Sequence, residues 1–154
     1  MDENPSFRLN GQEVALAAAD PTESLLRWLN RRGLTGTKEG CGDGDCGACT
    51  VAMVAVDADG RARYDAVNSC LLPMGQVVGR EVVTVEALAG PDGLHPVQQA
   101  MVECGGSQCG YCTPGFVMSL FAGYYAGESG DEVIAGNLCR CTGSVSRPGS
   151  SHRW

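Results

Sequence analysis

The stretch CGDGDCGACTV (residues 41–51) places three cysteines in a C-x4-C-x2-C pattern, and Cys70 follows further along the chain. This is the plant-type spacing for a [2Fe–2S] cluster, in which a loop curls so that two thiolates reach each iron. The interleaved glycines allow backbone angles closed to other residues and let N–H groups approach the sulfides. A structural zinc site is the alternative, but zinc motifs prefer two paired C-x2-C-like arms. The pattern therefore favours a cluster held by Cys41, Cys46, Cys49 and Cys70.

Segments on both sides of this loop predict a small unit of strands and one helix. Residues 6–16 form two short runs around Asn10-Gly11, a strong signal for a two-residue hairpin. Residues 20–33 predict a helix that Asp20 or Thr22 could cap. Further strands are expected at 49–56, 61–68 and 81–88. A hairpin, a helix and more strands together predict a β-grasp sheet with a helix across it.

The second half of the chain has a helical pattern. Residues 95–103, 113–127 and 131–143 have helical composition or spacing, with Thr113 as the expected N-cap and Pro114 at the first helical position. The predicted fold class is α+β. A β-grasp, ferredoxin-like [2Fe–2S] domain is expected over 1–78, a small four-helix-bundle domain that binds a second [2Fe–2S] cluster over 79–143, and an irregular tail over 144–154.

Four more cysteines form a second set, with Cys109 and Cys112 as C-x2-C and Cys139 and Cys141 as C-x-C. Spacing alone leaves a redox dithiol, half of a zinc site and an iron–sulfur cluster open. Both pairs lie at predicted helix starts, where free N–H groups favour thiolates and an anionic cluster. The ninth cysteine, Cys104, is expected to be a free thiol, because eight thiolates complete two clusters.

Composition narrows the class of protein further. The chain has 154 residues, nine cysteines and a formal net charge of −7, which argues against nucleic acid binding. The N-terminus lacks the basic and apolar regions of a secretory signal, and no apolar run is long enough to span a bilayer. We therefore expect a cytoplasmic protein in a reducing compartment, where clustered cysteines are metal ligands rather than disulfides.

Four stretches resemble the iron–sulfur subunit, or domain, of the molybdenum hydroxylases, the xanthine oxidase family. They are LTGTKEGCGDGDCGACTV (34–51), LHPVQQAM (94–101), GSQCGYCTPGFVMS (106–119) and AGNLCRCTG (135–143). The family includes xanthine dehydrogenase, aldehyde oxidoreductases and carbon monoxide dehydrogenase. The residues around Glu39 look most like the small subunit of bacterial xanthine dehydrogenase.

The resemblance implies an electron-transfer subunit of an oxidoreductase complex, with the substrate chemistry on a partner chain. Two [2Fe–2S] clusters would relay electrons from molybdopterin in a large molybdenum subunit to FAD on another subunit or domain, and then to NAD⁺. The resemblance assigns Cys109, Cys112, Cys139 and Cys141 to the cluster near the pterin. It places Gln108 and Cys141 against the pterin itself. No residue of this chain is expected to be catalytic.

After the CTG motif the chain departs from the family pattern, which continues with Tyr and then Arg-Pro. Residues 144–154 (SVSRPGSSHRW) lack periodicity, so we expect a truncation or frameshift at this point, with the ancestral chain running on into a flavin domain. Alternative functions are a small subunit for aldehyde, carbon monoxide or N-heterocycle oxidation, a stand-alone ferredoxin-like carrier, and a zinc-stapled interaction module.

Overall fold

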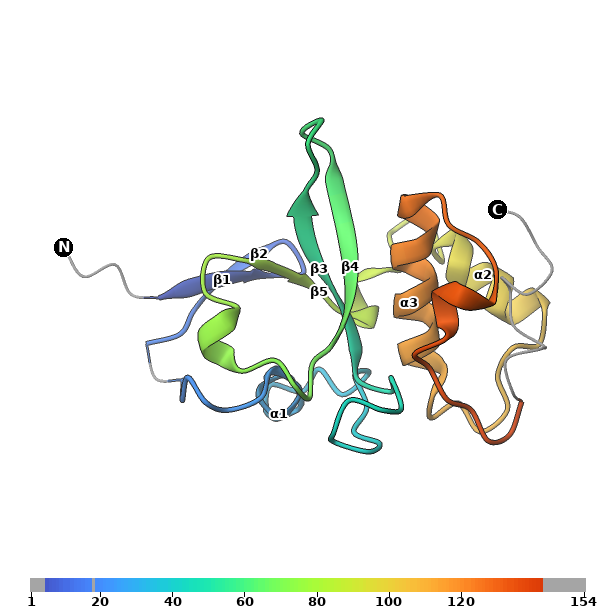
Figure 1. The fold of residues 1–154 in the computed structure, drawn as a ribbon, viewed down its shortest axis with the longest axis horizontal. Coiled ribbons are helices and arrows are strands. Elements are labelled where there is room, and N and C mark those ends of the chain that lie inside the picture. The colour runs from blue at the N-terminus through green and yellow to red at the C-terminus, as the bar shows by residue number, and fades with distance from the viewer. Residues whose placement is uncertain (1–4, 18, 143–154) are drawn as a thin grey trace.

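The computed structural model describes residues 5–17 and 19–142 (Figure 1). Five strands form one mixed sheet in the order β2-β1-β5-β3-β4. The strands are β1 (Ser6–Leu9), β2 (Gln12–Ala15), β3 (Thr50–Val56), β4 (Ala62–Asn68) and β5 (Glu81–Val83). The helices are α1 (Leu25–Arg31), α2 (Pro96–Glu103) and α3 (Thr113–Ala126), with 3-10 turns η1 (Met74–Gln76), η2 (Val85–Ala87) and η3 (Asp131–Ile134). The α+β class is confirmed.

The predicted hairpin forms at the expected residues. Strands β1 and β2 pair antiparallel, and the two residues between them, Asn10 and Gly11, have φ angles of 52° and 79°. Such left-handed angles suit the right-handed twist of the flanking strands. Strand β1 also pairs parallel with β5. Because β5 lies beyond residue 78, the sheet continues past the boundary that the sequence predicted between the two units.

Helix α1 begins later than the sequence predicted. Its N-cap is Ser24, whose hydroxyl accepts from the Arg27 N–H at 3.4 Å, so the expected caps were wrong. Asp20 instead accepts from the backbone N–H and the hydroxyl of Thr22, at 2.8 and 2.7 Å. These two residues close a turn of their own, which delays the start of the helix.

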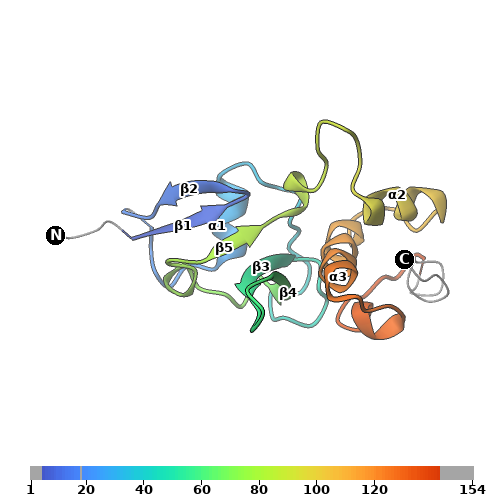
Figure 2. The same cartoon turned by 90° about the horizontal axis from the view of Figure 1, so that it is seen from above.

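The sheet lies between two apolar cores. On β3, Val51 and Met53 pack into the core that contains α1, whereas Ala52 faces the core that contains α3. This alternation follows from the two-residue period of a strand. Helices α1 and α3 thus cover opposite faces of one sheet, and α3 contacts both β3 and β4 (Figures 1 and 2).

Helix α3 is the central element of the second unit. Residues 115–123 are all buried, because β3 and β4 cover one side while α2 and η3 cover others. Cys112 is the N-cap and Thr113 the first helical residue, one position earlier than predicted. Residues 137–141 are not helical, so the expectation that Cys139 and Cys141 begin a helix was wrong. Among the described residues this unit contains the α-helices α2 and α3 and the 3-10 turns η2 and η3, and the four-helix bundle stays a prediction.

Two further expectations concern the ends of the chain and the membrane. The tail over 144–154 lies outside the described residues. Within residues 5–17 and 19–142, no helix has both the length and the apolar character needed to cross a bilayer.

Candidate metal centres

The loop that carries the first cysteine set directs backbone N–H groups at sulfur. The Cys41 Sγ accepts from the N–H groups of Asp45 and Cys46, each at 3.3 Å, and the Cys46 Sγ accepts from the Cys41 N–H at 3.3 Å. Such donors favour thiolate over thiol, and thiolate is the form that binds a metal. The backbone of this loop therefore stabilises the thiolate forms of Cys41 and Cys46.

Two thiols of this set have perturbed proton affinities. The Asp43 side chain, hydrogen-bonded to Cys41, opposes ionisation, but the backbone N–H groups of Asp43 and Cys46 outweigh it and lower the pKa of Cys41. Burial, followed by the hydrogen bond with Cys49, raises the pKa of Cys70 to about 12. A metal bound at Cys70 would displace this proton, which would couple site assembly to proton release.

The glycines of this loop fit a wrapped cluster. A Cβ on Gly40 would lie 2.6 Å from the Cys46 Sγ, and a Cβ on Gly44 would lie 2.4 Å from Leu71 Cδ1. Gly44 and Gly47 also have φ angles of 90° and 69°, which L side chains rarely adopt. The loop can close around a cluster because these positions carry no side chain.

The cysteines of the first set gather in two pairs. Cys41 and Cys46 share the hydrogen bonds described above, and Cys70 is hydrogen-bonded to Cys49. Cys41 is exposed, while Cys49 is buried beneath the loop. Among the described residues, no three His, Cys, Asp or Glu side chains converge on one ion-sized site. Two pairs are the arrangement that a two-iron cluster requires, since each iron takes two thiolates.

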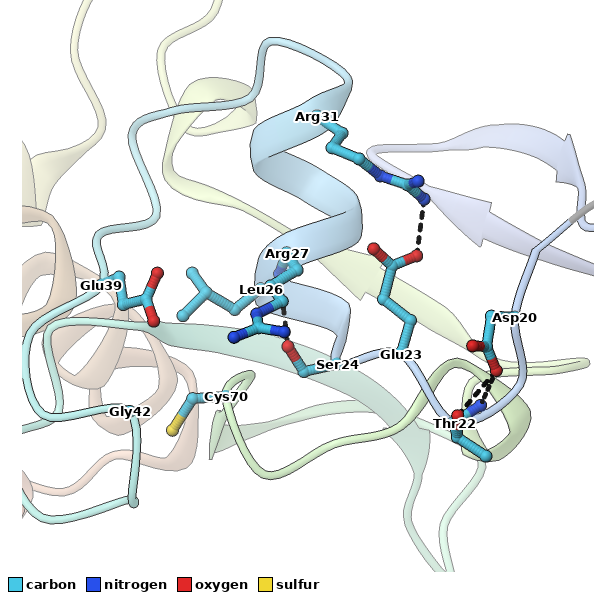
Figure 3. Close-up of a pocket in the computed structure, with 10 residues that line it drawn as sticks. All are labelled: Asp20, Thr22, Glu23, Ser24, Leu26, Arg27, Arg31, Glu39, Gly42 and Cys70. Atoms are coloured by element: carbon cyan, nitrogen blue, oxygen red, sulfur yellow. Dashed lines mark hydrogen bonds and ion pairs between the residues drawn. The ribbon is translucent and has the colours of Figure 1, made fainter.

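A polar cavity of about 570 Å³ opens beside this set (Figure 3). Glu39, Gly42 and Cys70 line one side, and Ser24 and Arg27 from the start of α1 line another. Figure 3 shows the Cys70 sulfur, the Glu39 carboxylate and the Arg27 guanidinium around the same opening. The first centre thus has a solvent-accessible side.

The second set also divides into an outer and an inner pair. Cys109 and Cys141 are exposed and hydrogen-bonded to each other, which raises the pKa of Cys141. Cys112 and Cys139 are half-buried and pack against the core around α3. The Thr142 N–H donates to the Cys139 Sγ at 3.2 Å. Gln108 is exposed next to Cys109.

The segments that carry the two sets lie in contact with each other, an arrangement that spacing alone did not predict. The Leu138 N–H donates to the Cys46 carbonyl at 3.0 Å. The Tyr111 hydroxyl donates to the Glu39 carbonyl. Each bond joins a residue next to or between cysteines of one set to the loop of the other. The buried Asn137 is a third link that sequence reasoning missed, although its place just before the C-x-C pair was a signal.

Cys104 belongs to neither set. It is exposed at the C-cap of α2, and its role as a free thiol stays a prediction.

The fold and the two cysteine sets define a class: a protein with two [2Fe–2S]-binding domains. The family models agree, since a 2Fe-2S iron-sulfur cluster binding domain matches residues 7–75 and a [2Fe-2S] binding domain matches residues 84–147. The chain belongs to the molybdenum hydroxylase family, as its iron–sulfur part.

Relatives of known structure and sequence support this assignment. Quinoline 2-oxidoreductase from Pseudomonas putida 86 matches with a TM-score of 0.75 and 32% identity, over 94% of this chain and 86% of that one. Xanthine dehydrogenase from Emericella nidulans is 43% identical over 92% of this chain, and aldehyde oxidase 2 from Cavia porcellus is 45% identical over 89%. This chain spans only about 11% of the length of each of these two relatives.

Proposed function

We propose that this chain is the electron-transfer component of a molybdenum hydroxylase, and that it links a molybdopterin-bearing partner to a partner that carries FAD. The observation that carries the proposal is the contact between the two cysteine-bearing segments, which includes the hydrogen bond from the Leu138 N–H to the Cys46 carbonyl. Each set keeps an exposed cysteine, Cys41 in the first and Cys109 in the second. An electron relay needs two redox centres that lie near each other. Each centre also needs a side that a partner protein can reach.

The cysteines themselves would hold the two centres. Cys41, Cys46, Cys49 and Cys70 are the proposed ligands of the first, and Cys109, Cys112, Cys139 and Cys141 those of the second. A bound [2Fe–2S] cluster supplies one-electron transfer. The surrounding N–H donors, such as those of Asp45 and Cys46, stabilise the thiolates and tune the potential.

Gln108 and Cys141 are the proposed contacts for the pterin. Gln108, Cys109 and Cys141 are all exposed. The Gln108 amide offers both a donor and an acceptor to a heterocycle edge. Cys141 would bring a ligand sulfur against the partner and shorten the electron path.

The polar cavity beside Cys70 is the proposed approach for the FAD-bearing partner. It leads from solvent to a cysteine of the first set, and its walls carry both charge signs through Glu39 and Arg27. Charged rims of this kind orient a partner and accelerate its association.

The relatives support a proposal for the particular reaction. Because xanthine dehydrogenases recur among them, we propose a purine-oxidising complex of the xanthine dehydrogenase type, working in the cytoplasm. Aldehyde or N-heterocycle oxidation is the alternative, since aldehyde oxidase 2 and quinoline 2-oxidoreductase also match.

The proposal is tested by iron, zinc and acid-labile sulfide analysis of the purified chain, with EPR of the reduced protein. We expect two distinct [2Fe–2S] signals and copurification with a large molybdenum-containing subunit from the native host. Zinc without sulfide would refute the proposal in favour of a zinc-stapled module. Two clusters without a molybdenum partner would instead indicate a stand-alone carrier.

A further inference from the structure

One buried amide, that of Asn137, joins the two cysteine-bearing segments. Its side chain is 7% exposed, and Leu138 and Cys139 follow it in the chain. The Asn137 Nδ2 donates to the Gly47 carbonyl at 3.1 Å. Gly47 directly follows Cys46, so this side chain ties the second segment to a peptide beside a cysteine of the first.

The Asn137 amide is held in one orientation by its other partners. The Ser119 hydroxyl on α3 donates to the Asn137 Oδ1 at 2.6 Å, which directs Nδ2 towards the first loop. The Thr50 hydroxyl lies 3.5 Å from Nδ2 and donates to the same Gly47 carbonyl at 2.7 Å. Ser119 and Thr50 are also buried. Because the three buried side chains bond to one another or to the Gly47 carbonyl, the network favours a single orientation of the amide.

Around the amide, the backbone at Gly47 packs directly against Gly136 and Asn137. A Cβ on Gly47 would lie 2.4 Å from the Gly136 carbonyl oxygen and 2.6 Å from the Asn137 Nδ2. The Leu138 N–H bond to Cys46 lies one residue further along. Asn137 therefore stands at a close approach of the two cysteine loops.

We propose that Asn137 is a positioning residue that sets the separation and orientation of the two cysteine sets without binding either centre. This inference rests on the proposed function. Electron tunnelling between two centres falls steeply with distance, so a residue that fixes their separation also fixes their electronic coupling. The Ser119–Asn137–Gly47 chain of hydrogen bonds supplies that constraint.

The test compares Asn137→Asp with Asn68→Asp in the full chain, each loaded with iron and sulfide. Aspartate matches asparagine in shape but, when ionised, cannot donate to the Gly47 carbonyl. Asn68, at the end of β4, is the matched control, because its Nδ2 donates to the Gly44 carbonyl of the first loop at 2.7 Å and does not involve the second cysteine segment. The measurement is the splitting, or relaxation enhancement, that two fully reduced neighbouring centres impose on each other's EPR signals. We expect loss of this interaction in Asn137→Asp, with iron and sulfide content unchanged, and its retention in Asn68→Asp.

A milder variant, Ser119→Ala, keeps the test valid if Asn137→Asp fails to fold. It removes only the hydrogen bond that holds the Asn137 amide in its orientation. It should weaken the interaction and leave both centres in place. The proposal is overturned if Asn137→Asp or Ser119→Ala holds both centres with an unchanged interaction, if Asn68→Asp loses it equally, or if the parent shows two centres without any interaction. A parent protein that binds no iron or sulfide contradicts the proposed function instead.

Discussion

Gly115, at the start of α3, lies so close to Gly47 in the first cysteine loop that a Cβ added to it would stand 2.1 Å from the Gly47 carbonyl oxygen. No real Cβ contact is that short, so one of the two segments would have to move. Gly47 and Gly115 are both buried, so either segment would have to disturb its packing in order to move. The absence of a side chain at position 115 is thus a condition for the contact between the two units.

Replacing Gly115 with alanine should separate the units and destabilise the protein by about 1–3 kcal/mol, the usual cost of overpacking. Gly136→Ala is the matched control, because an added Cβ there has nothing within 4 Å. Its effect should stay within about 0.5 kcal/mol. Denaturant unfolding of the three proteins measures the difference. Equal stability of Gly115→Ala and the parent would contradict the close approach.

Replacing single cysteines separates ligands from the free thiol. Cys139→Ser should remove iron and sulfide from the second centre, because the serine hydroxyl replaces a soft thiolate ligand. Cys104→Ser should leave the metal content unchanged, since Cys104 lies exposed at the end of α2. Metal analysis and EPR distinguish the outcomes. If Cys104→Ser also lowered the iron content, the division of the cysteines into two sets of four would be wrong.

The stability of the helical unit should depend on the protonation of His95. Its Nδ1 accepts from the Val97 N–H at 3.3 Å as part of a capping box, and burial lowers its pKa below the ordinary value of 6.5. Only the neutral ring can accept at Nδ1. The stabilisation is therefore complete above pH 6.5 and is lost as the pH falls through the lower pKa of the folded state.

The matched variant for this effect is His95→Asn, which keeps an N-cap acceptor that does not titrate. The difference in unfolding free energy between the parent and His95→Asn should shrink or change sign as the pH falls below 6.5. His95→Ala should cost about 1 kcal/mol at pH 8, the typical value of a lost cap. A difference between parent and His95→Asn that does not vary with pH would rule out the titration of His95 as its source.

The aromatic pair Tyr64 and Phe121 should contribute measurably to the docking of the two units. The rings meet edge to face, with centroids 4.8 Å apart, and Tyr64 comes from β4 whereas Phe121 comes from α3. A double-mutant cycle with Tyr64→Leu and Phe121→Leu should give a coupling of about 0.5–1.5 kcal/mol. Denaturant unfolding provides the values, and additive single effects would show that the rings do not interact.

Local patterns in the sequence were sufficient for much of this protein. The hairpin at Asn10-Gly11 and the two sets of cysteines are read from adjacent residues, because turn geometry and ligand spacing are local properties. The wrong predictions of the starts of α1 and α3 were also small shifts along the chain. The capping of α1 by Ser24 and the helix start at Thr113 each lie within a few residues of the predicted position, where several polar side chains compete for the same N–H groups.

The contact between the two cysteine sets was decided only by the tertiary structure. Residues 46–47 and 137–138 meet because α3 packs on the sheet face opposite α1, and no periodicity in either segment encodes that approach. The roles of Gly115 and Asn137 depend on what lies across the interface, some 70 to 90 residues away in the chain. Sequence spacing and family resemblance thus predicted which thiols form each set, whereas long-range packing determined how the segments that carry the two sets meet.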